Sequence, residues 1–215
     1  MKKIISVIFL FAIITAVYSV TIARLKYDGG GDWYNNPSVI PNIAAYFNEN
    51  VEPLFEEDEK VVTLKSPQLS QHPILYMTGH GNVGFSGIEL ENLRNYLKLG
   101  GFLLIDDDYG MDKSIRPVIS GLFREHKLQR LSVGNAIMKS VFNFDRIPKI
   151  HKHDDKSPEM YGIYINGRLA LLYLYETNIS DGWASPGVHE SDDEHTREQA
   201  LRFGANILFH VVTGL

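Results

Sequence analysis

Residues 74–108 read ILYMTGHGNVGFSGIELENLRNYLKLGGFLLIDDD, and they carry the clearest fold signal in the chain. Two short apolar runs, 74–77 and 102–105, flank an amphipathic pattern that begins at a capping box of Ser86 and Glu89 and stops at Gly100. Short unbroken apolar runs are typical of strands that are buried on both faces of a parallel sheet. The segment therefore predicts a strand, a crossing helix and a second, parallel strand.

The same alternation of strand-like and helical patterns continues on both sides of this unit. In chain order the further patterns are a strand at 20–27, a helix at 38–47 that is capped by Ser38, a strand at 61–64, a helix at 114–125 and a strand at 128–133. Residues 135–160 show no regular pattern. Such alternation predicts a mostly parallel sheet with helices on both faces.

The last third of the chain departs from strict alternation. Asn166-Gly167 lies between two strand-like runs, 161–165 and 168–175, and this dipeptide is the strongest short signal for a hairpin. A second capping box at 191–194 opens a predicted final helix. The fold class that we expect is α/β, a three-layer sandwich with a mostly parallel sheet and a late β-hairpin.

The first 19 residues look like a secretory signal peptide. Lys2 and Lys3 precede an apolar run, and small residues follow at Val17 and Ser19, the spacing of a cleavage site. An uncleaved membrane anchor is the alternative, since the apolar run reaches the lower length limit for spanning a bilayer. In either case we expect residues 20–215 to form a single domain outside the cytoplasm, periplasmic or secreted.

Charge and cysteine content exclude several function classes. The full chain has a net charge of −5 and lacks the basic footprint of a nucleic-acid-binding protein, so we expect no nucleic-acid partner. The chain contains no cysteine, which excludes disulfides, thiolate metal sites and a cysteine nucleophile. A membrane contact is expected only through the N-terminal segment, if that segment is retained. The P-loop, Gly-x-Ser-x-Gly and His-Glu-x-x-His motifs are also absent from the sequence.

Unusual residues follow several of the predicted strands. Residues 28–34 read DGGGDWY, 78–81 read TGHG and 106–110 read DDDYG. Because ligands bind beyond the carboxyl ends of the strands in open α/β sheets, we expect these segments to share one ligand-facing edge. Three consecutive glycines indicate left-handed dihedral angles or a close approach to the main chain. The residues that we assign to the ligand-binding surface are Gly29, Gly30, Gly31, Asp32, Trp33, Tyr34, Gly79, Gly81 and Trp183.

The aromatic residues of this surface have two possible roles. Trp33, Tyr34, Trp183 and Tyr109 can stack on a sugar or another flat ligand. The alternative is that such side chains close the top of the hydrophobic core.

Acidic residues and a histidine at the same edge are candidates for catalysis and for binding a cation. Asp108 and His80 are the candidate catalytic residues, as acid and base. Asp32, His80 and Asp106 are candidate ligands of a divalent cation, because carboxylate oxygens suit hard cations. The alternative is that one aspartate caps the next turn, the others are solvated or ion-paired, and His80 binds a backbone carbonyl. No ligand spacing here is diagnostic of a metal site.

Two other polar features are interpreted as structural. His151 and His153 lie on one side of an extended chain, as the histidines of some metal sites do, but their spacing does not match a familiar metal-binding motif. We expect a solvated polar loop there, and a metal site is the alternative. Arg24 and Lys26 alternate with apolar residues, which is the pattern of a half-buried strand with charges at the edge of a sheet.

Three segments, 23–38, 77–81 and 96–108, together resemble the bacterial family called domain of unknown function 4159. That resemblance implies the class I glutamine amidotransferase-like superfamily, a flavodoxin-like sandwich and no established activity. In amidotransferases of this fold, the strand after a Gly-Gly pair runs into a Cys-x-Gly elbow, and here Asp108-Tyr109-Gly110 stands in that place. An aspartate cannot form the glutamyl thioester, so the resemblance implies a shared architecture without glutaminase chemistry.

Two functions remain open from the sequence. The first is a non-catalytic domain that binds an unknown ligand or protein partner through the carboxyl edge of the sheet. The second is a hydrolase that depends on a metal or on acid–base chemistry and uses Asp108, Asp32 and His80. Convergence of these three side chains within hydrogen-bond reach in a closed cleft favours the hydrolase, and splayed side chains favour the binding domain.

Overall fold

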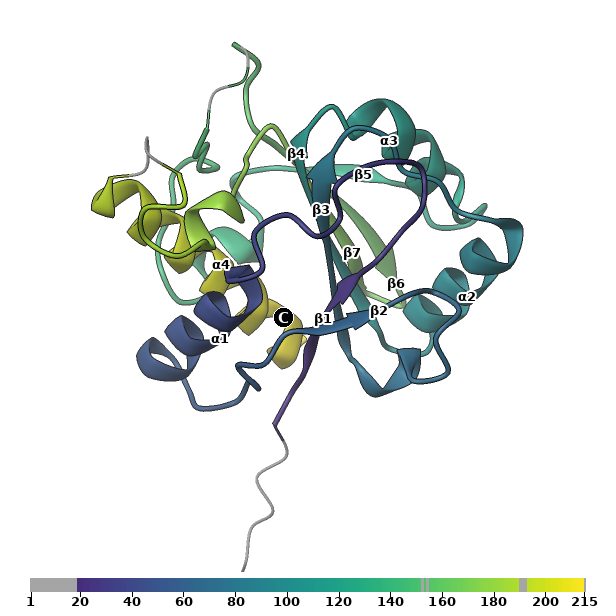
Figure 1. Ribbon diagram of the computed structural model, residues 1–215, viewed down its shortest axis with the longest axis horizontal. Helices are drawn as coiled ribbons and strands as arrows, with labels where there is room; N and C mark the ends of the chain where they lie inside the picture. Colours follow the sequence, from purple (N-terminus) through teal and green to yellow (C-terminus); the bar gives the residue numbers. More distant parts are fainter. Residues whose placement is uncertain (1–18, 152, 154, 190–192, 215) are drawn as a thin grey trace, which may run out of the picture.

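The computed structural model describes residues 19–151, 153, 155–189 and 193–214, and it contains a seven-stranded sheet between two layers of helices (Figure 1). The elements in chain order are β1 Ile22–Leu25, α1 Val39–Asn50, β2 Lys60–Val62, η1 Leu69–Gln71, β3 Ile74–His80, α2 Gly87–Lys98, β4 Phe102–Tyr109, α3 Asp112–Gly121, β5 Gln129–Leu131, η2 Ala136–Lys139, β6 Glu159–Ile165, β7 Arg168–Tyr175, η3 Asp181–Trp183 and α4 Glu194–Thr213. The predicted α/β class is confirmed. The predicted leader lies, apart from Ser19, outside the described residues.

The sheet is parallel over most of its width. Its strand order is β2-β1-β3-β4-β7-β6-β5, and the five strands from β2 to β7 pair in parallel. β6 is antiparallel to β7, and β5 is antiparallel to β6. Asn166 and Gly167 join β6 to β7 with φ angles of 52° and 80°, the left-handed conformation of a type I′ hairpin turn. The predicted late hairpin is therefore confirmed.

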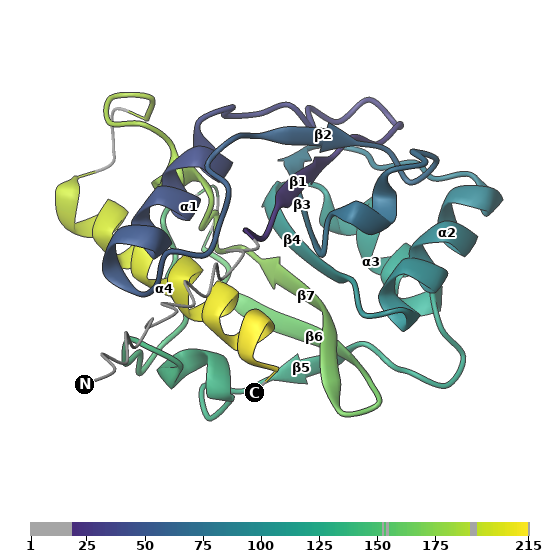
Figure 2. The ribbon, with the colours of Figure 1, turned by 90° about the horizontal axis from the view of Figure 1, so that it is seen from below.

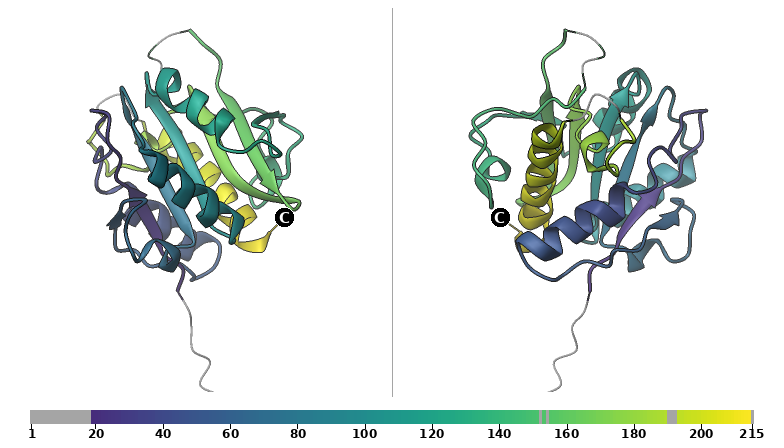
Figure 3. Two further views of the ribbon diagram at one scale, coloured as in Figure 1. Left: turned by 90° about the vertical axis from the view of Figure 1, so that its right-hand side faces the viewer. Right: turned by 60° about the vertical axis from the view of Figure 1, so that its left-hand side comes forward.

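Helices cover both faces of this sheet. α1 and α4 lie against each other on one face, and α2 and α3 lie on the other (Figure 2; Figure 3). Neighbouring residues of each strand alternate between the two resulting cores: Ile22 and Tyr76 face α1 and α4, and Ala23 and Leu75 face α2 and α3. In the part of the chain that the structure describes, no helix combines the length and the apolar character needed to cross a bilayer.

Two helix starts differ from the predicted ones. Ser38 does not cap α1, because its Oγ accepts a hydrogen bond of 3.0 Å from the backbone N–H of Ser185 instead. α4 begins at Glu194, and its N-cap is Asp193, whose side chain accepts a hydrogen bond from Thr196. The 191–194 capping box is therefore wrong in register, and residues 191 and 192 lie outside the described residues.

The central unit forms as the sequence predicts, with longer strands. The capping box of Ser86 and Glu89 is present at the start of α2. β3 continues to His80 and β4 continues to Tyr109, so the run of three aspartates lies inside β4 and is not part of a loop. This extension brings His80 and the aspartates to the end of two adjacent strands.

Candidate metal centre

The carboxyl ends of β1, β3, β4 and β7 reach the same edge of the sheet, because these strands are parallel (Figure 1). The strand order changes direction at β1, which has β2 on one side and β3 on the other. Ligands of open α/β sheets bind in the crevice at such a point. Asp32 from the loop after β1, His80 at the end of β3 and Asp108 near the end of β4 come together here.

His80, Asp32 and Asp108 converge within hydrogen-bond reach. Nδ1 of His80 lies 3.0 Å from Oδ2 of Asp32 and 3.2 Å from Oδ2 of Asp108. The backbone N–H of His80 also donates to Oδ1 of Asp32. The side chain of Asp108 is buried, whereas that of His80 is 44% exposed. The group is therefore anchored in the interior and open to solvent on one side.

His153 joins this group from the irregular stretch before β6. One ligand atom each of His80, Asp108 and His153 lie within 4.8 Å of one another, close enough to share a metal ion. The rings of His80 and His153 have centroids 6.2 Å apart, and the ring of Tyr109 lies 4.7 Å from that of His153. The stretch is irregular as predicted, and His153 is exposed, with its ring in contact with those of His80 and Tyr109 at the sheet edge.

A second group of the same composition lies beside the first. His151, Asp181 and His189 place one ligand atom each within 4.8 Å of one another. Nδ1 of His151 lies 2.9 Å from Oδ2 of Asp181, and Nε2 of His189 lies 3.5 Å from Oδ1 of Asp181. Asp181 is buried, and both histidines are partly buried. The edge thus holds two groups, each made of two histidines and one buried aspartate.

The two groups meet at Asp108 and Asp181, whose carboxyl groups lie near enough for each to shift the pKa of the other. Burial raises the pKa of Asp108 to about 8, and the nearby carboxylate of Asp181 adds to the increase, while His80 opposes it. Burial also raises the pKa of Asp181, but the hydrogen bond from His151 and the charges of His189 and His151 together outweigh it, and the net pKa lies below the usual value. Two adjacent carboxyl groups that cannot both ionise hold one proton between them.

The electrostatic state of His80 follows from the same carboxylates. Burial lowers its pKa, but the neighbouring Asp108 and Asp32 outweigh this effect, and the net pKa is raised. His153 has a lowered pKa, because burial and the nearby His80 and His151 disfavour its charged form. A positive charge on the ring of His80 or His151 therefore disfavours protonation of the ring of His153.

The glycine-rich loop after β1 packs tightly on the loop after β3. A Cβ atom on Gly29 would lie 2.5 Å from the backbone nitrogen of Gly84, and one on Gly31 would lie 2.8 Å from the carbonyl oxygen of Asn82. The N–H of Gly31 donates to that same oxygen at 3.0 Å. These glycines therefore permit two backbones to touch, and no side chain fits between them.

The remaining predicted glycines have different surroundings. Gly79 has a φ of 140°, and a Cβ there would meet the hydroxyl of Tyr27 first and would lie 2.9 Å from Oδ1 of Asp32. Gly30 and Gly81 also have positive φ angles, 91° and 81°, but a Cβ on either would meet no atom within 4 Å. Gly79 thus leaves room for both Tyr27 and Asp32, and the other two leave open space.

Arg24 fixes the far end of the same loop. It is fully buried and binds both carboxylate oxygens of Glu59, at 2.9 and 2.8 Å. It also donates to the carbonyl oxygens of Trp33, Asn35 and Asn36, at 3.2, 2.8 and 3.0 Å. The prediction of an edge-strand charge is wrong for Arg24, because β1 lies between β2 and β3 in the sheet.

Three asparagine side chains orient the two aspartates. Asn35 donates to Oδ2 of Asp108 at 2.7 Å, and Asn178 donates to Oδ1 of Asp108 at 2.6 Å. Asn36 donates to Oδ1 of Asp181 at 3.0 Å. Asn36 and Asn178 have positive φ angles of 54° and 49°, a conformation that asparagine tolerates better than most residues. The amides hold both carboxylates in fixed directions.

The other two aspartates of β4 are structural in their contacts. Asp106 is fully buried and accepts hydrogen bonds from Thr177 at 2.7 Å and from the N–H and Oγ of Ser180 at 2.7 and 2.6 Å. Asp107 faces the opposite side and accepts from Tyr173 at 3.1 Å. Burial raises the pKa of both carboxyls, that of Asp107 to about 6. Asp106, a predicted cation ligand, instead anchors the loop after β7.

The predicted aromatic residues divide into buried and exposed ones. Trp183 is only 2% exposed, and its Nε1 donates to the carbonyl oxygen of Ala200 at 2.8 Å, so it closes the core and does not face a ligand. Trp33 is half-buried. Tyr34 and Tyr109 are 64% and 45% exposed. These two tyrosines provide the exposed aromatic surface near the group.

Sequence reasoning did not single out Asp181 and His189, and it gave little weight to His151 and His153. These residues lie in irregular segments that only tertiary packing brings together. The single local signal was the His-x-His spacing of 151 and 153, which is too common to identify a metal site by itself.

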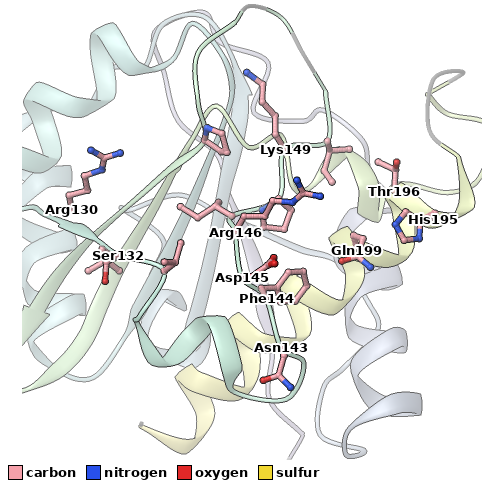
Figure 4. Close-up of a pocket in the computed structure, with 16 residues that line it drawn as sticks. Arg130, Ser132, Asn143, Phe144, Asp145, Arg146, Lys149, His195, Thr196 and Gln199 are labelled. Carbon is pink, nitrogen blue, oxygen red and sulfur yellow. The ribbon is translucent and has the colours of Figure 1, made fainter.

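A large pocket lies elsewhere on the molecule. It has a volume of about 1020 Å³ and is lined by β5, the segment before β6 and the start of α4 (Figure 4). Arg130 and Lys149 on its wall are paired with Glu159 and Glu176, at 2.7 and 3.2 Å. Neither of the two histidine–aspartate groups lines it. The candidate site at the sheet edge is therefore separate from this pocket.

Comparison with known families agrees with the resemblance seen in the sequence. Residues 21–212 match the family described as Domain of unknown function (DUF4159), whose description assigns no activity. No curated protein matches the chain. Function must therefore be argued from the geometry of the site.

Proposed function

We propose that this chain, which belongs to the family described as Domain of unknown function (DUF4159), is a hydrolase that depends on a divalent metal ion. The observation that carries the proposal is the convergence of His80, Asp108 and His153, whose ligand atoms lie within 4.8 Å of one another at the carboxyl edge of the sheet. Two imidazoles and one carboxylate suit Zn²⁺ and related first-row metals, and catalytic sites of this kind keep a coordination position for water.

The spacing of the group supports this ligand set. A tetrahedral zinc ion with bonds of about 2.0–2.1 Å holds its ligand atoms roughly 3.3 Å apart. Nδ1 of His80 and Oδ2 of Asp108 are 3.2 Å apart. A cation would also take the place of the proton that Asp108 and Asp181 share and would relieve their mutual repulsion. The exposed side of His80 leaves a path for substrate.

The neighbouring residues have distinct roles in this proposal. A metal ion held here lowers the pKa of a bound water toward neutrality. Asp32 orients His80 through the hydrogen bond that its Oδ1 accepts from the backbone N–H of His80. Its other oxygen, Oδ2, belongs to a one-third-exposed side chain and is available to accept a proton from water. Asn35 and Asn178 hold Asp108 in position.

The test is metal binding and turnover by the purified protein after chelator treatment. We expect Zn²⁺ binding in calorimetry and Zn²⁺-dependent hydrolysis within a panel of ester, amide and phosphoester substrates. His80→Gln should weaken Zn²⁺ binding at this position by more than about 100-fold, since even partners outside the ligand set contribute 10–100-fold. His126→Gln is the control, because His126 belongs to neither histidine–aspartate group. Absence of tight binding, or unchanged binding in His80→Gln, overturns the proposal.

A second candidate is non-catalytic binding of a ligand or protein partner at the same edge. It is favoured by the exposed rings of Tyr34 and Tyr109, the latter in contact with His153. Metal uptake without turnover of any substrate in the panel would support this candidate over the hydrolase.

We also propose a flavodoxin-like fold related to the class I glutamine amidotransferase-like superfamily. The parallel strands follow the order β2-β1-β3-β4-β7, which corresponds to the doubly wound order 2-1-3-4-5. Asp108 and Tyr109 end the central strand β4 and Gly110 follows it, which is the place of the elbow in that superfamily. Because the chain has no cysteine, the kinship extends to architecture and not to glutaminase chemistry.

An extracytoplasmic location, periplasmic or secreted, is also part of the proposal. It is supported by the lysines, apolar run and small residues of the first 19 positions. Cell fractionation and the intact mass of the purified protein test the location and the cleavage. Recovery of the full-length chain from the cytosolic fraction would contradict both.

A further inference from the structure

His151, Asp181 and His189 form a group that the proposed metal site does not use. They come from three separate segments: the stretch before β6, the short helix η3 and the loop before α4. Their ligand atoms nevertheless lie within 4.8 Å of one another around a buried carboxylate. Such convergence of two imidazoles on a buried carboxylate has the composition of a metal site.

Asn36 contacts two members of this group. Its Nδ2 lies 3.0 Å from Oδ1 of Asp181 and 3.0 Å from Nε2 of His189. These two atoms of Asp181 and His189 lie 3.5 Å apart, which is close to the roughly 3.3 Å that tetrahedral zinc imposes on its ligand atoms. A cation bound to Nε2 of His189 would take the lone pair on that nitrogen and displace the amide of Asn36 from it.

This group borders directly on the proposed metal site. Two successive residues of one loop connect the two carboxylates, because Asn35 donates to Asp108 at 2.7 Å and Asn36 donates to Asp181 at 3.0 Å. The histidine rings form a continuous row in the order His80, His153, His151 and His189, with successive centroids 6.2, 6.4 and 4.9 Å apart. Two cations bound here would therefore be neighbours.

We propose that His151, Asp181 and His189 bind a second divalent cation and that the two groups together form a two-metal centre. This inference rests on the proposed function, because it places the second ion beside the first. Paired metal ions stabilise both the attacking and the leaving oxygen of a hydrolytic displacement. In this proposal His151, Asp181 and His189, which have no role in a hydrolase with one metal ion, are the ligands of the second ion.

The test is the Zn²⁺ stoichiometry of the full chain after chelator treatment, measured by elemental analysis and calorimetry. We expect two equivalents for the unaltered chain and one equivalent for each of His189→Gln, His151→Gln and His80→Gln. His195→Gln should keep two, because His195 is an exposed histidine of α4 that belongs to neither group. Circular dichroism establishes that each variant folds.

The outcomes separate this inference from the proposed function. A single equivalent that His80→Gln removes, and that His189→Gln and His151→Gln both retain, overturns the second site and leaves the proposed function standing. No bound Zn²⁺ in the unaltered chain overturns both. Two equivalents that persist in both His189→Gln and His151→Gln show that these residues are not ligands.

Discussion

Asn35 donates a hydrogen bond of 2.7 Å to Asp108 and so ties the glycine-rich loop to the end of β4. The position of Asn35 is itself fixed, because Arg24 binds its carbonyl oxygen at 2.8 Å. Arg24 in turn is held by Glu59 beneath the sheet edge. Folding and the position of Asp108 are therefore linked through one ion pair, in which Arg24 is buried and Glu59 is partly buried.

Arg24→Met tests that link. The change leaves Glu59 without its partner and three carbonyl oxygens without a donor. Removal of one partner from a buried ion pair costs about 3–5 kcal/mol, so we expect the free energy of unfolding in urea to fall by that amount. Lys26→Met is the matched control: Lys26 is exposed and contacts the ring of Trp33, so its loss should cost about 1 kcal/mol or less. Equal losses for the two variants would contradict the role of Arg24.

Asp108→Asn should separate metal binding from folding. Burial raises the pKa of Asp108 to about 8, so the metal-free carboxyl is largely uncharged at neutral pH, and asparagine resembles it in size and charge. We expect the free energy of unfolding to change by about 1 kcal/mol, the typical contribution of a single hydrogen bond, while Zn²⁺ binding by the group of His80, Asp108 and His153 and any hydrolysis are lost. Asp28→Asn, at an exposed acid just before the glycines, should change neither. A Zn²⁺ stoichiometry and affinity equal to those of the unaltered chain in Asp108→Asn would remove Asp108 from the site.

Gly79→Ala should damage the site more than Gly81→Ala does. Both positions have positive φ, so each substitution introduces backbone strain of roughly 1 kcal/mol. At Gly79 the new methyl would also lie 2.9 Å from Oδ1 of Asp32, whereas Gly81 has open space. We expect Gly79→Ala to lower both the melting temperature and Zn²⁺ affinity, and Gly81→Ala to lower mainly the melting temperature. Identical Zn²⁺ titrations for the two variants would show that Gly79 does not position Asp32.

His210 predicts a dependence of stability on pH. This residue of α4 is buried, and burial lowers its pKa below 6.5. The unfolded chain therefore binds a proton at a higher pH than the folded chain, so the contribution of His210 to stability is lost as the pH falls below about 6.5. His210→Leu should gain stability relative to the unaltered chain at pH 5 and less at pH 8. The measurement is urea unfolding at both values, with the exposed His195→Leu as control; parallel pH profiles for His210→Leu and the unaltered chain would contradict the prediction.

Features that depend on neighbouring residues were predictable from the sequence. Ser86 and Glu89 form their capping box, and Asn166-Gly167 forms its turn, because both structures are specified within four residues. The alternation of apolar runs and amphipathic patterns likewise predicted the sheet and its covering helices.

Features that depend on the position of a residue within the sheet were not predictable from the sequence. The alternation around Arg24 fits an edge strand and an internal strand equally well, and only the strand order shows that β1 is internal. No local sequence pattern marks Asp181 and His189 as candidate ligands. They form a group only together with His151, which lies in another segment of the chain. Recognition of such a group requires the tertiary structure.

The N-terminal end of β1 and the histidine–aspartate groups lie at opposite ends of the parallel strands. Val20 pairs with Phe55 at the amino end of this strand, while the histidine–aspartate groups lie beyond the carboxyl ends of the parallel strands. Whatever is joined to the chain before residue 19 is therefore attached at the pole opposite the site. A protein tethered to a surface through that pole would present its histidines outward to the surrounding medium, and a substrate would reach them without passing between the protein and its support.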